Sequence, residues 1–435
     1  MPKSIILKGQ VLAFKDDPFA VDLDDAVSHE VSGAVWIEDG FIRSTNPADA
    51  LIAEAEDVPV YDYGDSLIVA GFIDCHSHYP QLPIIASYGE QLLEWLEKYT
   101  FPREAAYSDS GIAKEAAEFF LEENLRNGIT TSSVYATVHP ESVDAFFEAA
   151  SMRNLRMACG KVLMNRNAPK NLTDTVQSGY DDTKNLIERW HGKGRNIYAI
   201  TPRFAITSTP EQLESAGALW SEYPDVLMQT HLSENHDELQ WVAELFPNEK
   251  DYFHVYEKYG LTGPGAIFGH AIHLKERERE AIYNSGSAIA HCPTSNTFIG
   301  SGLFDMKGLR GGLRPINTGL ATDVAGGSSL SMFATMRTAY EIAQLQGYSL
   351  HPLKNWYLAS VGAAKTMHIE DRVGNIAPGM EADITIIDLK STPLIARRVS
   401  QAENFWDILF AQIILGDDRA IKATYVFGEL VYESH

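Results

Sequence analysis

Two histidines separated by one residue follow a short apolar run near the start of the chain. His76 and His78 come directly after the segment 67–73, whose composition is typical of a buried β-strand. Side chains at positions i and i+2 of a strand point to the same side, so both imidazoles would reach one point beyond the strand end. Such a pair suits a divalent transition metal, zinc first. In a chain with 14 histidines this pair is a weak signal, so the interpretation depends on residues further along.

Three further residues that can bind metals or carry protons end later apolar runs, namely His231, His270 and Asp323. Together, His76, His78, His231 and Asp323 would supply three imidazoles and a carboxylate. This set binds one zinc ion and leaves a position for water, whose pKa the metal lowers toward neutrality. We therefore predict one zinc ion per chain, and iron would fit the same ligands.

Glu234 lies three residues after His231, where it can turn back over the metal and act as a proton shuttle. Taken alone, a carboxylate here also suits the first turn of a following helix. His270 could be a fifth ligand or could donate to the substrate. We favour the second role, because four ligands and a water already fill a zinc sphere. For His273 and His291 a structural role is the better interpretation.

A scaffold must bring these strand ends together. Eight apolar runs of strand length alternate with helix-like segments such as 112–121. The runs lie at 68–75, 128–134, 156–163, 197–201, 226–231, 266–270, 287–291 and 319–323. This alternation predicts an α/β fold, a (β/α)8 TIM-like barrel, whose active site lies at the C-terminal ends of its strands.

A second metal in such a barrel would need a bridging group, commonly a carbamylated lysine at the end of the fourth strand. The sequence at that place is Thr201-Pro202-Arg203-Phe204, which contains no lysine. One metal is therefore the better prediction.

The two ends of the chain are rich in short strand-like segments. We expect a hairpin within 5–14 and another within 33–42, the second with Asp39-Gly40 at its turn. The segments 382–388 and 423–431 have the same character. Neither end has enough apolar residues for a core of its own, so we predict one small β-sandwich domain built from both termini. The predicted divisions are 1–67 and 373–435 for this domain and 68–372 for the barrel.

Charge and cysteine content limit the possible partners. The chain has 35 Lys and Arg against 59 Asp and Glu, a formal net charge of −24, which would repel nucleic acids and anionic membranes. We expect a small-molecule partner, no signal peptide and no membrane span, since no run of eighteen apolar residues occurs. The three cysteines, Cys75, Cys159 and Cys292, are far apart, which predicts reduced thiols and a cytoplasmic location.

The motifs together resemble those of the guanine deaminases, a branch of the amidohydrolase superfamily. The superfamily pattern lies in 71–78, His231 with Glu234, His270 and Thr322-Asp323. The purine branch is indicated by the segments 79–81, 88–96, 99–102, 201–204, 231–235, 290–293 and 322–327. The resemblance covers 69–335 and the terminal β domain. It implies hydrolytic deamination of guanine to xanthine and ammonia, as in purine catabolism, a free purine base as partner, and a homodimer.

The resemblance also implies roles for particular residues. Zinc would lie on His76, His78, His231 and Asp323, and a zinc-bound hydroxide would attack C2 while Glu234 moves protons. The implied catalytic residues are Glu234, Asp323 and His270. The implied substrate-binding residues are His78, Gln81, Arg203, Phe204, Glu234, His270 and Asp323. Gln81 and Arg203 would hydrogen-bond the purine edge, including its 6-oxo group, and Phe204 would pack on the ring.

Three alternatives to this function can be compared with the sequence. The same barrel could act on another ring, such as 8-oxoguanine, a triazine or an adenosine derivative. A different class of zinc deaminase uses H-x-E with P-C-x-x-C; His139-Pro140-Glu141 supplies the first half, but the chain has no C-x-x-C, which excludes that class. A metal-free barrel serving as a binding module would have no need of five intact site residues, and a metal analysis separates it from an enzyme.

Overall fold

The computed structural model describes residues 4–88 and 91–434, and its larger part is a barrel of parallel strands. The strands are β5 (Phe72–Ser77), β6 (Ile129–Tyr135), β7 (Arg156–Gly160), β9 (Ile197–Pro202), β10 (Leu227–Leu232), β11 (Ala266–His270), β12 (Ala288–His291) and β13 (Thr318–Leu320). Each pairs in parallel with the next along this order, and β8 (Val162–Leu163) pairs with β9. The ends meet where the amide of Asp323 donates to the carbonyl of His76 at 2.9 Å. The predicted (β/α)8 barrel is confirmed.

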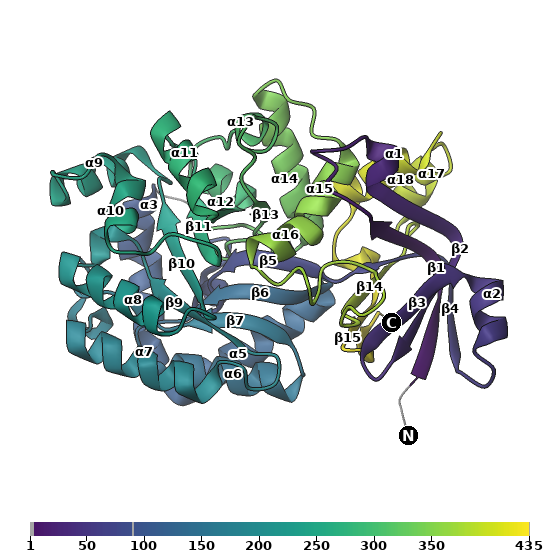
Figure 1. The fold of residues 1–435 in the computed structure, drawn as a ribbon, viewed down its shortest axis with the longest axis horizontal. Helices are drawn as coiled ribbons and strands as arrows, with labels where there is room; N and C mark the ends of the chain where they lie inside the picture. Colours follow the sequence, from purple (N-terminus) through teal and green to yellow (C-terminus); the bar gives the residue numbers. More distant parts are fainter. Residues whose placement is uncertain (1–3, 89–90, 435) are drawn as a thin grey trace.

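Helices connect the barrel strands and surround them (Figure 1). The longer ones are α5 (Ser110–Arg126), α6 (Pro140–Met152), α7 (Val176–Trp190), α8 (Pro210–Glu222), α9 (His236–Leu245), α11 (Glu276–Ser285) and α14 (Met332–Leu345). Shorter helices are α10 (Tyr252–Lys258), α12 (Pro293–Phe298), α13 (Met306–Arg310), α15 (Pro352–Leu358) and α16 (Val361–Thr366). The predicted helix 112–121 lies inside α5, whose N-cap Asp109 accepts from the amides of Gly111 and Ile112.

The loop after β5 forms a series of short helical turns that cover the C-terminal end of the barrel. They are η1 (Tyr79–Ile84), α3 (Leu92–Trp95), the π-helical turn η2 (Leu96–Thr100), α4 (Phe101–Glu104) and η3 (Ala105–Ser108). Other single turns are η4 (Lys170–Leu172), η5 (Ala205–Thr207) and η6 (Asp418–Ala420).

Three barrel strands differ from the prediction. The predicted strand 68–75 is divided, because residues up to Ala70 belong to β4 (Val60–Ala70) of a second sheet and the barrel strand β5 begins at Phe72. The segment 156–163 is divided into β7 and β8, because the chain leaves the β7 register after Gly160. The last strand, β13, ends at Leu320, so Thr322 and Asp323 lie in the loop beyond it. Asp323 has φ of 47°, a left-handed backbone that cannot continue a strand.

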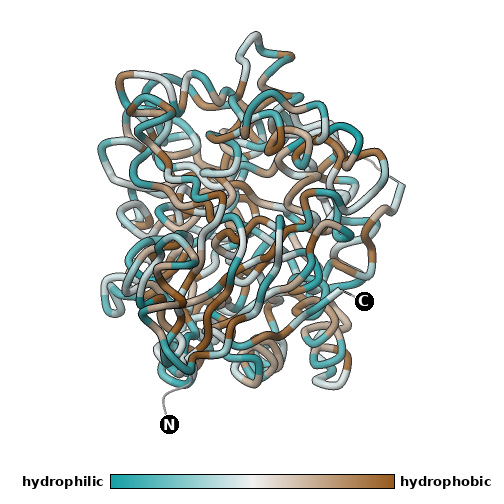
Figure 2. The backbone as a smooth tube through the Cα atoms, turned by 90° about the vertical axis from the view of Figure 1, so that its right-hand side faces the viewer, coloured by the Kyte–Doolittle hydropathy of each residue, from teal (hydrophilic) through white to brown (hydrophobic). Residues whose placement is uncertain are grey.

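Both termini contribute to a second, seven-stranded sheet, as predicted (Figure 1). Its order is β16 (Glu429–Glu433), β15 (Ile421–Val426), β14 (Ile384–Ile387), β4 (Val60–Ala70), β1 (Ser4–Phe14), β2 (Val27–Glu38) and β3 (Phe41–Pro47). Four helices accompany it: α1 (Leu23–Ala26), α2 (Ala48–Glu54), α17 (Pro393–Val399) and α18 (Phe405–Leu415). Figure 2 faces this side of the molecule, where apolar stretches run along neighbouring extended segments. The boundaries at 67/68 and 372/373 stay predictions.

One of the two predicted N-terminal hairpins is present. The hairpin of β2 and β3 turns at Asp39 and Gly40, with φ of 52° and 85°, as an Asp-Gly turn of type I′ requires. The hairpin predicted within 5–14 is wrong, because those residues form the single strand β1. Gly9 allows a close approach there rather than a turn: a Cβ at this position would lie 2.9 Å from the carbonyl oxygen of Ser66.

The terminal sheet attaches to the N-terminal end of the barrel. Arg156, the first residue of β7, and Arg195, which precedes β9, both pair with Glu381. Thr385 of β14 donates to the carbonyl of Gly128, which precedes β6, at 2.9 Å. The opposite end of the barrel, where the C-terminal ends of the strands lie, is therefore left for a site.

All three cysteines are buried and none forms a disulfide among the described residues. In this same part of the chain, none of the helices combines the length and the apolar character needed to cross a bilayer.

Candidate active site

Three histidines meet at the C-terminal end of the barrel. His76 and His78 leave β5, and His231 comes from β10. The Nε2 atom of His78 lies 3.2 Å from Nε2 of His76 and 3.2 Å from Nε2 of His231. Asp323 adds a carboxylate, with Oδ1 3.3 Å from Nε2 of His76 and 3.4 Å from Nε2 of His78. The structure thus brings the four predicted ligands together.

These separations fit a bound metal ion. Two ligands held 2.0–2.1 Å from one zinc at a tetrahedral angle lie about 3.3 Å apart. The four separations involving His78 and His76 lie close to this value. Unprotonated ring nitrogens at such distances repel one another unless a cation or a proton lies between them. The donor set therefore fits one zinc ion.

The charge state of these side chains also suits a metal. Burial lowers the pKa of His76 and holds the pKa values of His78 and His231 well below the usual range, so the rings are neutral. Nδ1–H of His231 donates to the carbonyl oxygen of Arg203 at 2.7 Å, which leaves Nε2 free to act as a ligand. Burial alone raises the pKa of Asp323, but the hydrogen bond and charge of His76 and the charges of His270 and His231 outweigh it and lower this pKa to about 2.

Asp74 joins the first strand of the barrel to the loop that follows the last strand. Its Oδ1 accepts from the amides of Thr322 at 3.0 Å and His76 at 3.2 Å, and its Oδ2 accepts from the Thr322 hydroxyl at 2.5 Å. These bonds connect β5 to the loop that carries Asp323. Burial raises the pKa of Asp74 to about 7, although the bonds from Thr322 oppose the rise.

Glu234 is placed by the start of the helix that follows it. Ser233 has φ of 50°, which turns the chain, and Oε2 of Glu238 in α9 accepts from the amides of Glu234 at 2.7 Å and Asn235 at 3.1 Å. Oε1 of Glu234 accepts from the hydroxyl of Ser301 at 3.0 Å. Burial raises the pKa of Glu234 to about 7, a value at which a carboxyl group exchanges protons readily at neutral pH.

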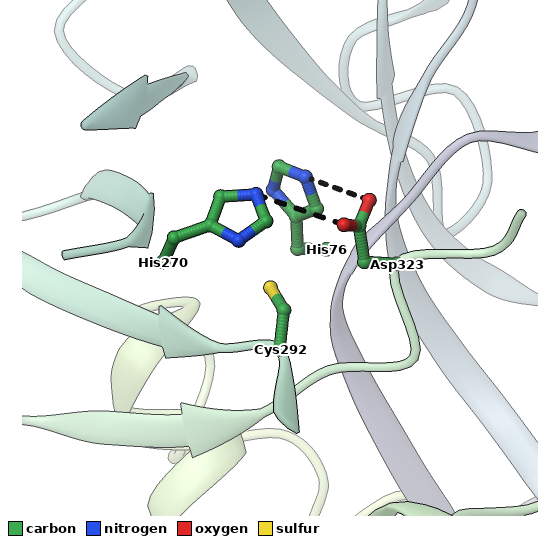
Figure 3. A group of neighbouring side chains, drawn as sticks. All are labelled: His76, His270, Cys292 and Asp323. Carbon is green, nitrogen blue, oxygen red and sulfur yellow. Dashed lines mark ion pairs between the residues drawn. The ribbon is translucent and has the colours of Figure 1, made fainter. Parts of the chain in front are cut away.

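His270 faces both carboxylates of the site. Its Nε2 lies 3.4 Å from Oε2 of Glu234. It also lies 3.6 Å from Oδ2 of Asp323, a pair that Figure 3 marks with a dashed line. Nδ1–H donates to Oδ1 of Asn296 at 2.8 Å, which fixes the ring. Burial opposes protonation, but the charges of Glu234 and Asp323 and the bond to Asn296 outweigh it and raise the pKa of His270.

Cys292 lies below His270 and Asp323 in Figure 3. With these two residues and His76 it forms a second group of possible metal ligands. Burial holds the pKa of its thiol well above the usual range, so the thiol stays neutral and is a poor metal ligand. Its Sγ contacts the carbonyl oxygen of Ala290 at 3.5 Å. The four-residue group drawn in Figure 3 is therefore a weaker ligand set than the three histidines with Asp323.

A pocket opens directly over these residues. Its lining comprises His78, Gln81, Leu92, Trp95, Leu96, Arg203, Phe204, His231, Glu234, His270, Ser295, Ile299, Asp323 and Gly326. Every predicted substrate-binding residue is among them. Leu92, Trp95 and Leu96 contribute apolar side chains to this lining. The pocket thus combines apolar side chains with polar and charged groups that can orient a small molecule.

Some residues around the site were not anticipated from the sequence. Asn296, which holds His270, lies in α12, and Ser301, which holds Glu234, follows that helix. The buried carboxylate of Glu104 bonds both Gln81 and Arg203. Its position two residues after the recognised segment 99–102 was the available signal.

Two histidines that were expected to be structural lie outside the pocket lining. His291 stacks on Phe304 with ring centroids 4.1 Å apart, and burial lowers its pKa to about 3. Nε2–H of His273 donates to the carbonyl oxygen of Ser301 at 2.9 Å.

Comparison with known proteins adds four findings. A model described as "Amidohydrolase family" matches residues 67–431. The guanine deaminase of Escherichia coli (strain K12) is 47% identical over 413 residues, which cover 93% of this chain and 94% of that protein. The solved structure of E. coli guanine deaminase matches with a TM-score of 0.97 at 44% identity, covering 99% of this chain and 100% of the other. A guanine deaminase from C. acetobutylicum with bound guanine matches with a TM-score of 0.88 at 27% identity, covering 99% and 100%.

Proposed function

The chain belongs to the amidohydrolase family, and from this premise we propose that it hydrolyses guanine to xanthine and ammonia. One observation carries the proposal: a carboxyl group with a pKa of about 7, Glu234, lies beside a zinc-compatible ligand set under a pocket lined by Arg203 and Gln81. The relatives named above, one of them with guanine bound, support the choice of substrate. We place the reaction in purine catabolism.

We propose that His76, His78, His231 and Asp323 hold one zinc ion. When bound, zinc supplies Lewis-acid chemistry and lowers the pKa of water at the site. Support comes from the neutral, mutually facing imidazoles and from the ionised carboxylate. Iron would be held by the same ligands, and a metal analysis of the purified protein separates the two.

Glu234 moves the protons in this proposal. It takes a proton from the water whose oxygen attacks C2 of guanine, and it gives that proton to a ring nitrogen. The hydroxyl group now on C2 gives its proton to Glu234 or Asp323, which passes it to the exocyclic nitrogen; the bond from C2 to that nitrogen breaks, C2 becomes a carbonyl, and ammonia leaves. His270 donates from Nε2 toward the attacking oxygen, a role that its raised pKa favours.

The remaining pocket residues orient the ring. Arg203 donates to the 6-oxo group, Gln81 bonds the same edge, and Phe204 packs against the ring face. His78 contacts the substrate from the metal side. All four side chains line the pocket, and Arg203, Gln81 and Phe204 are at most 4% exposed.

We further propose a homodimer, by analogy with the family, and a cytoplasmic location, which the three buried, unpaired cysteines favour.

Ammonia release from a panel of bases tests the substrate. Guanine, 8-oxoguanine, adenine, cytosine and melamine are each incubated with protein of known zinc content. Fast release from guanine alone is expected. Release from another ring at full zinc content would keep the metal site and overturn the assignment of guanine.

A further inference from the structure

Glu104 is a carboxylate with no access to solvent, at the end of α4. Its Oε1 accepts from Nε2 of Gln81 at 3.0 Å and from Nη1 of Arg203 at 2.9 Å, and its Oε2 accepts from the same Nη1 at 2.8 Å. Within the described residues, Glu104 does not line the pocket, whereas both of its partners do. Burying an ion pair costs desolvation free energy, which good geometry and added hydrogen bonds offset, and both partners of Glu104 line the pocket.

The bond to Glu104 fixes the orientation of Gln81. A carboxylate only accepts hydrogen bonds, so the NH2 end of the Gln81 amide must face Glu104. The carbonyl oxygen Oε1 is then the group that Gln81 presents to the pocket. Without Glu104 the amide could turn over and present donors instead.

Glu104 also neutralises Arg203. The guanidinium is 3% exposed, and its Nη1 is occupied by both carboxylate oxygens. Its Nε and Nη2 groups make no side-chain hydrogen bond across residues 4–88 and 91–434, so they remain as donors for a ligand. The pocket therefore presents an arginine donor beside a glutamine acceptor without excess positive charge.

We propose that Glu104 is a positioning residue that makes this pocket selective for a neutral lactam edge, a carbonyl oxygen next to a ring N–H. The proposal deepens the proposed function, on which it rests. A lactam matches the donor of Arg203 and the acceptor of Gln81 together. An amino-substituted ring offers the reverse pattern, and an anionic ring finds no net positive charge to balance its own.

Kinetics and inhibition of Glu104→Gln test the charge. Wild-type protein is expected to bind hypoxanthine, a neutral lactam, more tightly than urate, an anion at neutral pH. In the variant Arg203 is no longer neutralised, so the KM for guanine rises about tenfold or more while kcat changes less. The ratio of the urate inhibition constant to the hypoxanthine inhibition constant should fall about tenfold, because urate binds relatively more tightly. A folded variant in which KM and this ratio are both unchanged would overturn the proposal.

Glu104→Asp keeps the charge and protects the test against misfolding of the glutamine variant. Its shorter side chain cannot bond Gln81 and Arg203 together, so the KM for guanine should rise while the urate to hypoxanthine ratio stays at the wild-type value. A wild-type KM in Glu104→Asp would also overturn the proposal. Glu97→Gln, at an exposed position on the neighbouring turn, is the matched control and should leave all constants unchanged.

The proposed function and the positioning role of Glu104 can be overturned independently. If wild-type protein releases no ammonia from guanine, the proposed function is wrong. If it does and the Glu104 variants behave like wild type, only the positioning role is wrong.

Discussion

One carboxylate of the proposed site, that of Glu234, is needed for turnover but not for metal binding. Glu234 lies beside the metal ligands but is not one of them, and its backbone is held by the capping interaction with Glu238. Glu234→Gln should therefore keep the zinc content of wild-type protein while kcat falls by about 10²–10⁴, the range for loss of general acid–base catalysis. Steady-state kinetics with a metal analysis of the same sample give both values.

Asp237→Asn serves as the control for this substitution, since Asp237 is exposed in the first turn of the same helix. It should leave kcat unchanged. Substantial turnover by Glu234→Gln at full zinc content would show that another group moves the proton.

Asn296 acts through the ring that it holds. Asn296→Ala removes the acceptor 2.8 Å from Nδ1 of His270, so the ring loses its orientation and one cause of its raised pKa. We expect kcat/KM to fall about 10–100-fold, as for other residues that orient active-site histidines. Thr297→Ala, at the exposed next position, should have no effect; equal kinetics for the two variants would contradict the role of Asn296.

The residues proposed as metal ligands were predicted from the sequence, but the residues that support them were not. His76, His78 and His231 could be found because their types and positions at strand ends carry the chemical information. Asn296 and Glu104 could not be found in this way, since their function depends on which parts of the chain meet in space. Neither residue type nor spacing indicates that Glu104 reaches Arg203, 99 positions further along the chain.

At the level of secondary structure, Asp74 joins the first and last strands of the barrel. Asp74→Ala leaves three donors without an acceptor, two on Thr322 and one on His76, and releases the loop of Asp323. Zinc affinity should fall about 10–100-fold, measured by competition with a chelator. Asp74→Asn is the matched control: its Oδ1 can accept both amide bonds and its NH2 can donate to the Thr322 hydroxyl. Affinity near wild type in the alanine variant would contradict this account.

The sequence predicted the order of the helices and strands well, but it predicted the residues at which they begin and end less accurately. Alternating apolar runs gave eight barrel strands because buried parallel strands need continuous apolar residues. The predicted hairpin within 5–14 failed because Gly9 serves a close approach to Ser66, a contact that local sequence does not show. Likewise β13 stops before Asp323, whose left-handed backbone is imposed by the site around it.

For the whole molecule, ion pairs at Glu381 hold the terminal sheet to the barrel. Arg156 and Arg195 both donate to this carboxylate, which is 6% exposed. Glu381→Gln leaves the largely buried guanidinium of Arg156 without a carboxylate partner and that of Arg195 with Asp383 alone, so the free energy of unfolding at pH 7 should fall by about 3 kcal/mol. Thermal unfolding provides the measurement, and a shift of less than 1 °C would contradict the role.

The same carboxylate predicts a pH dependence of stability. Burial alone raises the pKa of Glu381, but the bond from Arg156 and the charges of both arginines outweigh it and lower the pKa below the usual 4.5. A carboxylate whose pKa is lower in the folded state stabilises the fold above about pH 4.5, and this contribution is lost as the pH falls through the folded-state value. Glu381→Gln should therefore lose less stability than wild type between pH 5 and pH 3.

Glu38→Gln is a control for both measurements. Its pair with Arg43, at 2.9 Å, is on the surface, with side chains 36% and 46% exposed. An exposed pair contributes about 0–1 kcal/mol, so this variant should unfold close to the wild-type temperature.

The most direct test of the central claim is the conversion of guanine to xanthine as a function of metal occupancy. Protein is stripped with a chelator, reloaded with measured amounts of zinc, and assayed for xanthine and ammonia. The account predicts equal amounts of both products and a rate that rises in proportion to zinc, up to one ion per chain. No xanthine at full occupancy, or an undiminished rate after the metal is removed, would contradict it.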